Sequence, residues 1–225
     1  MKTTFLLSSV TALIAIAPLA QAQMTGRLYD PMPPDNSSYL RVLDTVPGQP
    51  VSVLVDGKVH VKSLPARTVS DYLVIPSGKH HVQVTIAGKS QGTVELDLVQ
   101  KNAYTVVFPN AKSHPWTFTD RTSTNKLKSM LAVYNVDPLA GPLDVKTADG
   151  KTKVFTSLEA GQPAILEVNP INVKLAVFKS GTTTASGMAN LTMQRGSAYS
   201  LFLLPAANGL EIVSAQNHRE RYTGK

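Results

Sequence analysis

The chain has 225 residues, a formal net charge of +7 and no cysteine. The lack of cysteine excludes disulfide stabilisation, thiol catalysis and cysteine-ligated metal sites within this sequence. An excess of Lys and Arg can indicate contact with an anionic polymer or a membrane surface. Because no dense basic block occurs, we favour the interpretation that these residues solvate the outer faces of strands.

Residues 1–22 have the pattern of a secretory signal peptide. Lys2 supplies a positive start, the stretch 5–17 is mainly apolar, and Ala20-Gln21-Ala22 ends the segment with small residues. The apolar stretch is shorter than the roughly 20 residues that a membrane-spanning helix needs. We therefore predict an exported chain that is cleaved after Ala22.

Residues 23–38 are interpreted as a Pro-rich extended arm. Pro31, Pro33 and Pro34 restrict the backbone and cannot donate backbone hydrogen bonds, which disfavours a regular strand. Such an arm could lie along a sheet edge or reach a partner. Tyr29 in the arm and Arg41 in the first strand after it are candidate binding residues, because of their type and position.

The region 39–110 is repeated in 128–225. "QKNAYTVVFPNA" near the end of the first copy matches "QRGSAYSLFLLPAANG" in the second, and "DGK" at 56–58 matches "DGK" at 149–151. Corresponding residues lie about 90 positions apart, well beyond the 20–50-residue periods of solenoid repeats. Because the order of several such matches is preserved, we predict two tandem domains that arose by internal duplication.

Both copies are predicted to be all-β. Apolar residues alternate with polar ones in short runs, which is the period of half-buried strands, and the Asp-Gly pairs predict two-residue type I′ hairpins. About seven short strands per copy favour a small antiparallel β-sandwich of immunoglobulin-like size over a barrel. The clearest runs are 51–61, 82–86, 94–98 and 104–108 in the first copy, and 173–177, 191–193 and 199–203 in the second.

Residues 111–127 are predicted to link the two domains, because they are rich in Ser, Thr and other polar residues. The only tryptophan, Trp116, lies here with Phe118 nearby. One hypothesis is that Trp116 stacks on a sugar or anchors a partner. The alternative, which we favour, is that it packs into the seam between the two sandwiches, since Trp is usually largely buried.

No stretch of the sequence has the pattern of an active site or a metal site. Gly88-x-Ser90-x-Gly92 has the spacing of a nucleophile elbow, but strands are predicted on both sides of it, whereas the elbow requires a helix to follow. His80 and His81 are adjacent, so on a strand they face opposite sides and cannot share a metal. We therefore predict no catalytic residues, no metal and no cofactor, and sparse aromatic residues argue against nucleic-acid binding.

Several segments together resemble one known family. These are "LYDPMPPDNSSYLRV" at 28–42, "LDVKTADGKTKVF" at 143–155 and "VNPINVKLAVFKSG" at 168–181. They are similar to segments of the AlgF family of alginate O-acetylation proteins. In the first segment the residues that carry the resemblance are Leu28, Tyr29, Pro31, Pro34, Ser37, Ser38, Tyr39, Arg41 and Val42.

The resemblance implies a periplasmic accessory protein in the O-acetylation of the exopolysaccharide alginate. Such a protein works with a membrane-bound O-acyltransferase and with periplasmic SGNH-type acetyltransferases, whose Gly-Asp-Ser nucleophile motif this chain lacks. Our leading hypothesis is thus a non-catalytic adaptor. The alternative is a carbohydrate-binding module that holds anionic polymannuronate, with Trp116 and the basic charge as its motivation. An enzymatic role would need Ser90 or a carboxylate pair that the sequence does not reveal.

Overall fold

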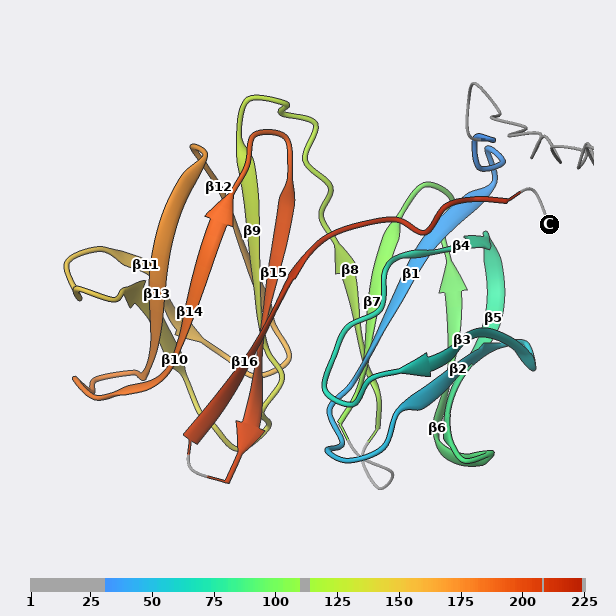
Figure 1. Cartoon of the computed structure of the whole chain (residues 1–225), viewed down its shortest axis with the longest axis horizontal. Helices are drawn as coiled ribbons and strands as arrows, with labels where there is room; N and C mark the ends of the chain where they lie inside the picture. The colour runs from blue at the N-terminus through green and yellow to red at the C-terminus, as the bar shows by residue number, and fades with distance from the viewer. Residues whose placement is uncertain (1–30, 110–113, 208, 224–225) are drawn as a thin grey trace, which may run out of the picture. The chain divides into compact units, whose positions relative to one another are not determined.

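The computed structural model describes residues 31–109, 114–207 and 209–223. The predicted signal peptide and Tyr29 lie outside the described residues. The chain from Pro31 onward forms one compact unit, in which all the strands belong to four four-stranded sheets (Figure 1). In the part of the chain that the structure describes, we find no helix whose length and hydrophobicity would let it cross a membrane.

The first sandwich consists of eight strands in two sheets. One sheet has the order β4-β1-β7-β8 and the other has the order β3-β2-β5-β6. The strands are β1 (Ser37–Asp44), β2 (Val51–Val55), β3 (Lys58–Leu64), β4 (Leu73–Pro76), β5 (Gly78–Ile86), β6 (Lys89–Leu98), β7 (Ala103–Phe108) and β8 (Trp116–Asp120).

The second sandwich repeats this topology strand for strand. Its sheets have the orders β12-β9-β15-β16 and β11-β10-β13-β14, so adding eight to each strand number of the first sandwich gives the second. This confirms the predicted duplication of an all-β sandwich. The strands are β9 (Ser129–Asn135), β10 (Leu143–Thr147), β11 (Lys153–Leu158), β12 (Pro163–Val168), β13 (Ile171–Lys179), β14 (Ala185–Met193), β15 (Ala198–Ala206) and β16 (Gly209–Gln216).

One pair of strands in each sandwich differs from the purely antiparallel arrangement that we expected. β1 pairs with β7 in parallel, and β9 pairs with β15 in parallel. Parallel neighbours require a long crossover connection. Here the crossover includes strands of both sheets, since β4 and β12 return to the sheet of the parallel pair. The alternation pattern of a single strand is the same for both strand directions, so it could not reveal the parallel pairing.

Each sandwich has its own apolar core, which the alternating residues of the facing sheets fill. In β2 the inward residues Val51, Val53 and Val55 are buried while the residues between them are partly exposed. The first core also includes Leu40 and Val42 of β1, and the second includes their counterparts Leu131 and Val133 of β9. Burial of these apolar side chains is the main stabilisation of such a layered fold.

The two Asp-Gly turns differ. Asp56 and Gly57 both have positive φ, 50° and 77°, and join β2 directly to β3, which confirms the predicted type I′ hairpin. At the second position the same prediction is wrong, because β10 ends at Thr147 and β11 begins only at Lys153. There the Asp149 carboxylate accepts hydrogen bonds from the Thr147 hydroxyl and the Lys151 amide, and these bonds stabilise a wider loop.

The matched segments "NAYTVVF" and "SAYSLFLL" have the same structural role. The Tyr104 hydroxyl accepts a hydrogen bond from the Val99 amide at 3.0 Å. The Tyr199 hydroxyl accepts one from the Gln194 amide at 3.2 Å. In both cases the tyrosine at the start of a strand binds the backbone five residues upstream, an arrangement like the tyrosine corner of immunoglobulin-like sandwiches. The repeated sequence therefore encodes the corner that leads into β7 and into β15.

Candidate functional site

A buried network of polar side chains lies in a seam between equivalent sheets of the two sandwiches. The strands β1 and β7 pair Arg41 with Thr105 and Leu43 with Val107. Their counterparts in β9 and β15 pair Ala132 with Ser200 and Tyr134 with Phe202. The outward faces of both strand pairs contribute to one buried apolar cluster, whose fully buried members are Leu43, Val107, Phe118, Ala132, Tyr134, Val136, Phe202 and Leu204.

Arg41 lies inside this seam, only 1% exposed. Its Nε donates to the Thr105 hydroxyl at 2.8 Å and its Nη1 donates to Asn217 Oδ1 at 2.8 Å. Its Nη2 donates to the Ser200 hydroxyl at 2.9 Å and to the Tyr134 hydroxyl at 3.3 Å. The guanidinium carbon also lies 4.5 Å from the centre of the Tyr72 ring. A single side chain of the first sandwich thus binds three residues of the chain beyond Ser129.

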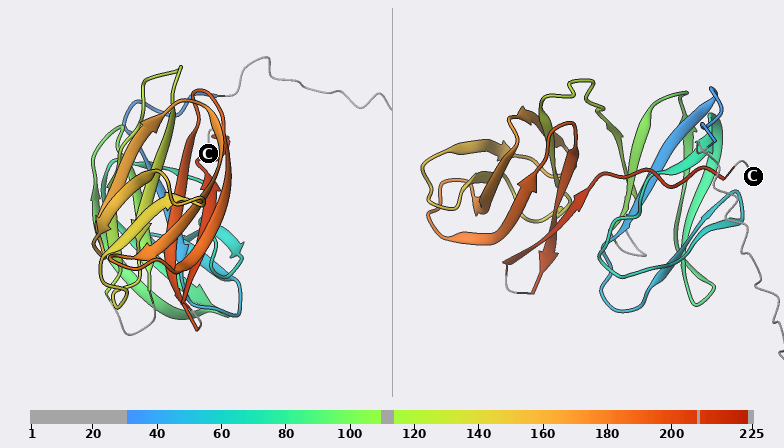
Figure 2. Two further views of the ribbon diagram at one scale, coloured as in Figure 1. Left: turned by 90° about the vertical axis from the view of Figure 1, so that its left-hand side faces the viewer. Right: turned by 45° about the horizontal axis from the view of Figure 1, so that its top comes forward.

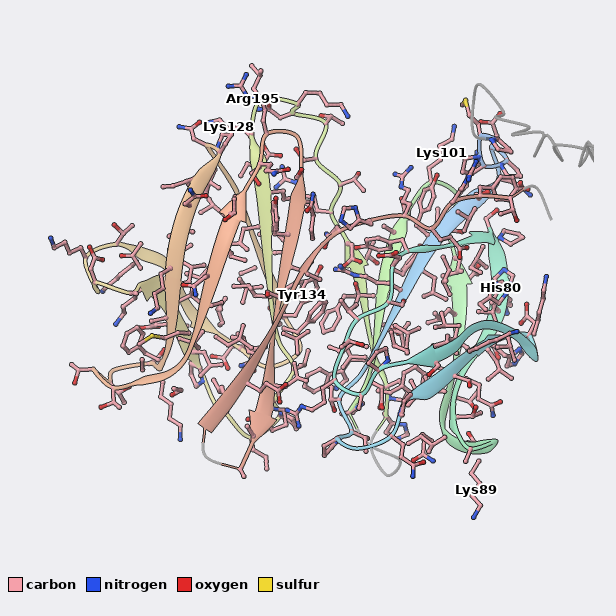
Figure 3. All side chains as sticks on the ribbon, in the orientation of Figure 1. His80, Lys89, Lys101, Lys128, Tyr134 and Arg195 are labelled. Atoms are coloured by element: carbon pink, nitrogen blue, oxygen red, sulfur yellow. The ribbon has the colours of Figure 1, made fainter. Side chains whose placement is uncertain are left out.

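Asp120, at the end of β8, balances the charge of Arg41. One carboxylate oxygen lies 3.8 Å from Arg41 Nε and accepts hydrogen bonds from the Tyr72 hydroxyl at 2.7 Å and the Thr105 hydroxyl at 2.5 Å. The other oxygen accepts from the Tyr134 hydroxyl at 2.6 Å. Figure 3 shows Tyr134 where the two sandwiches meet.

The two tyrosines act as neutral donors in this network. Burial, and secondly the negative charge of Asp120, raise the pKa of the Tyr72 and Tyr134 hydroxyls far above the usual range. Both hydroxyls therefore stay protonated and donate hydrogen bonds to Asp120. The polar groups of the seam satisfy one another, so this cluster stabilises the junction between the sandwiches and offers none of its main charges to a substrate.

Sequence reasoning selected Arg41 as a candidate binding residue, and the structure places it in the seam as a structural residue. Its partners Asp120, Thr105, Ser200 and Asn217 were missed. One signal could have found them: the counterpart of Arg41 in the second copy is Ala132, and a charged residue that replaces alanine in an apolar strand needs a buried partner. The identity of that partner follows only from the tertiary fold.

Trp116 also lies at the seam. It begins β8, a strand inside the segment 111–127 that was predicted to be a linker, and it pairs there with Val107. Its ring meets Phe118 edge to face, with the ring centres 6.4 Å apart, and it packs half-buried against the seam cluster. This position is the one that the seam hypothesis expects, while contact with a sugar or a partner stays a prediction.

A cleft of about 150 Å³ opens above the buried network at one end of the seam. Its lining includes Tyr39, Tyr72, Arg121, His218 and Arg219. The guanidinium carbon of Arg219 lies 3.9 Å above the Tyr39 ring. Two arginines and a histidine beside two aromatic rings are chemically suited to a carboxylate group on a cyclic ligand.

The residues that were considered for catalysis, Ser90, His80 and His81, do not line this cleft. Ser90 is exposed on β6, after a two-residue turn that joins β5 to β6, and its hydroxyl accepts a hydrogen bond from Gln83. The predicted strand–turn–strand context is confirmed. His80 and His81 contact different carboxylates, Asp56 and Glu95. Within the described ranges, no group of three His, Asp or Glu could hold a metal ion.

Comparison with known proteins identifies the family. The family model described as "Alginate O-acetyl transferase AlgF" matches residues 11–200. A protein of Pseudomonas putida named "Alginate biosynthesis protein AlgF" is 30% identical over 194 residues, which cover 86% of this chain and 85% of the relative. A protein of the same name from Pseudomonas aeruginosa is 27% identical over 201 residues, which cover 89% of this chain and 88% of the relative.

A solved structure is also similar to part of the chain. The C-terminal domain of AlgF from P. aeruginosa covers 41% of this chain and 100% of its own length, at 28% identity and with a TM-score of 0.36. The family assignment rests on the sequence matches, which extend across both sandwiches. The chain belongs to the AlgF family of alginate biosynthesis and O-acetylation.

Proposed function

We propose that this protein is a non-catalytic periplasmic adaptor in alginate O-acetylation. It binds a membrane-bound O-acyltransferase complex and a periplasmic SGNH-type acetyltransferase, and so couples the delivery of acetyl groups to their transfer onto the polysaccharide. The predicted signal peptide at 1–22 supports the periplasmic location.

The observation that carries this proposal is that the buried polar groups of the seam bind one another and join the two sandwiches. Arg41, Asp120, Tyr72 and Tyr134 form a buried cluster of the kind in which a catalytic constellation would be sought, because its members lie together and are buried, charged or strongly shifted in pKa. All four belong to one network, in which Asp120 accepts from both tyrosines and pairs with Arg41, and this network holds the two sandwiches together. A doubled β-sandwich with a fixed junction presents a large surface of strands and loops, which suits protein binding.

The adaptor proposal is tested with the complete mature chain. An affinity-tagged chain is mixed with the purified periplasmic acetyltransferase and, separately, with detergent-solubilised O-acyltransferase complex. We expect both to be retained on the tagged chain. If neither is retained at micromolar concentration, the adaptor proposal is wrong.

The family description names an acetyltransferase, so catalysis needs its own test. The purified chain is incubated with 4-nitrophenyl acetate as acetyl donor and with alginate oligomers as acceptor. We expect no acetyl transfer above the rate of the buffer. Transfer that Ser90→Ala abolishes would establish an enzyme and overturn the proposal.

The basic cleft favours a second candidate function, the binding of anionic polymannuronate. Arg121 and Arg219 can each offer paired N–H donors to a uronate carboxylate, and Tyr39 offers a ring face. Titration of the chain with mannuronate oligomers should then release heat, and the affinity should fall with added salt. Unchanged binding in an Arg121→Ala, Arg219→Ala double variant would exclude the cleft as the binding site for mannuronate oligomers.

A further inference from the structure

The duplication allows equivalent sheet edges to be compared, and they are covered differently. In the first sandwich Leu73 of β4 pairs with Leu40, and in the second Leu166 of β12 pairs with Leu131, the counterpart of Leu40. Leu73 is 3% exposed, whereas Leu166 is 38% exposed. The same position is therefore closed in one copy and open in the other.

The edge of β4 is closed by the chain that follows β16. The Tyr72 amide donates to the His218 carbonyl, and the Glu220 amide donates to the Tyr72 carbonyl, both at 2.9 Å. The Glu220 carboxylate accepts from the Val74 amide at 2.8 Å. Figure 2 shows this extended segment passing from β16 to the first sandwich, where it joins the sheet in the manner of an added strand.

A side chain of the same segment also lies beside the edge strands of the two sheets. Tyr222 is half-buried and lines one cavity together with Val59 of β3 and Val74 of β4. The covering segment thus supplies both backbone hydrogen bonds to the edge strand and a bulky ring beside the edges of the two sheets.

The corresponding edge of the second sandwich has neither feature in the described part of the chain. β12 is the last strand of its sheet. Beside it lies a cavity of about 340 Å³, whose walls are mostly apolar and reach the core residues Leu131 and Met193. Leu166 and Ile171, which is 52% exposed, stand at this cavity. Apolar walls that reach the core and an unpaired strand edge are together a template for an added strand.

The rim of the cavity carries positive charge. Lys153 lines the cavity, and Lys128 donates from Nζ to Asn169, another lining residue, at 2.7 Å. Arg195 lies at the same end of the sandwich as Lys128 (Figure 3). The one acidic residue of β12, Glu167, accepts a hydrogen bond from Ser123. The rim therefore favours an occupant with acidic residues on either side of an apolar one.

We propose that the free edge of β12 binds an extended segment of a partner protein. The segment pairs with β12 as an additional strand, inserts a bulky apolar side chain into the cavity beside Leu166 and Ile171, and places acidic residues near Lys128 and Lys153. It does for the second sandwich what the chain after β16 does for the first. This inference rests on the proposed adaptor function, and it assigns the binding surface for the periplasmic acetyltransferase.

The test measures binding of the purified acetyltransferase to the complete mature chain and to point variants. Leu166→Asp and Ile171→Asp place a charge at the cavity without removing a fully buried side chain, and Lys153→Glu reverses the charge of the rim. The matched control is Leu139→Asp on the same sandwich, where the leucine is 92% exposed and lies outside the cavity. Thermal unfolding of each variant verifies that it is folded.

We expect Leu166→Asp and Ile171→Asp to weaken binding at least tenfold, Lys153→Glu to weaken it several-fold, and Leu139→Asp to leave it unchanged. Added acetyltransferase should also slow the hydrogen exchange of the β12 amides.

If the acetyltransferase binds all variants equally, the β12 edge is not its binding site, while the adaptor function stands. If the acetyltransferase does not bind the unaltered chain, the inference fails; the adaptor function fails with it if the O-acyltransferase complex is not retained either. Self-association that Leu166→Asp abolishes would assign the edge to a second copy and overturn the inference.

Discussion

The two sandwiches share one topology, but the chain covers their equivalent sheet edges and outer faces differently. The first sandwich closes its β4 edge with the chain that follows β16 and buries Leu73, whereas the second leaves Leu166 exposed at the edge of β12. The second sandwich in turn contributes Tyr134, Ser200 and Phe202 to the seam that encloses Arg41. After a duplication, one copy can thus be closed by its neighbour's tail while the equivalent edge of the other remains free for binding.

The strongest test of the seam is the removal of Arg41. Because Asp120 would be left buried without its countercharge, Arg41→Met should lower the free energy of unfolding by about 3–5 kcal/mol. Chemical denaturation measures this loss. Arg121→Met, which alters an exposed arginine, is the control and should cost less than about 0.5 kcal/mol. Equal effects of the two substitutions would show that the seam network contributes nothing to stability.

The difference between the two edges predicts unequal costs for the same substitution. Leu73→Ala removes a buried side chain and should cost about 2–4 kcal/mol, while Leu166→Ala at the open edge should cost less than about 1 kcal/mol. Urea unfolding of both variants gives the comparison. If Leu166→Ala is as costly as Leu73→Ala, the edge of β12 is not open in solution.

A third comparison concerns the last residue of β1. Asp44 is fully buried, its Oδ2 has no hydrogen-bond partner among the described residues, and burial raises its pKa to about 6. Its counterpart in the second copy is Asn135, whose amide nitrogen donates to the Gly141 and Leu158 carbonyls. The first copy thus keeps a carboxyl group where the second has a neutral amide.

The sign of the pH effect follows from the raised pKa. The folded chain binds the Asp44 proton more tightly than the unfolded chain, so the free energy of unfolding should fall as the pH rises from about 4 to 6 and stay lower above that. Asp44→Asn should therefore stabilise the protein by about 1–2 kcal/mol at pH 7 and have no such effect at pH 4. The reciprocal Asn135→Asp should destabilise it at pH 7. Thermal unfolding between pH 4 and 7 checks both, and a gain for Asp44→Asn that is equal at all pH values would contradict the assignment.

The smallest expected effect concerns the repeated tyrosine corners. Tyr104→Phe and Tyr199→Phe each remove one hydrogen bond to a backbone amide, so each should cost about 1 kcal/mol. Because the corners lie in different sandwiches, the double variant should lose the sum of the two. Guanidinium unfolding of the three variants measures this. Clearly unequal costs would mean that the two corners, although matched in sequence, contribute unequally to the free energy of unfolding.

Much of the fold follows from the sequence. The alternation at 51–55, the Asp-Gly turn at 56–57 and the matched Ala-Tyr segments predict a doubled β-sandwich, because strand period and turn geometry are local properties of the chain. The second Asp-Gly turn was predicted incorrectly, since the side-chain hydrogen bonds of Asp149 compete with the hairpin.

The sequence by itself determined the two modules and their inward faces. Only the tertiary structure decided what happens to the outward faces: that Arg41 is buried between sandwiches, that Trp116 begins a strand, and that one sheet edge is covered while its equivalent is open. The reason is physical. The pattern of a strand records which side chains point away from its own core, but whether that side meets water, a second sheet or the chain's own tail depends on contacts between residues far apart in the sequence.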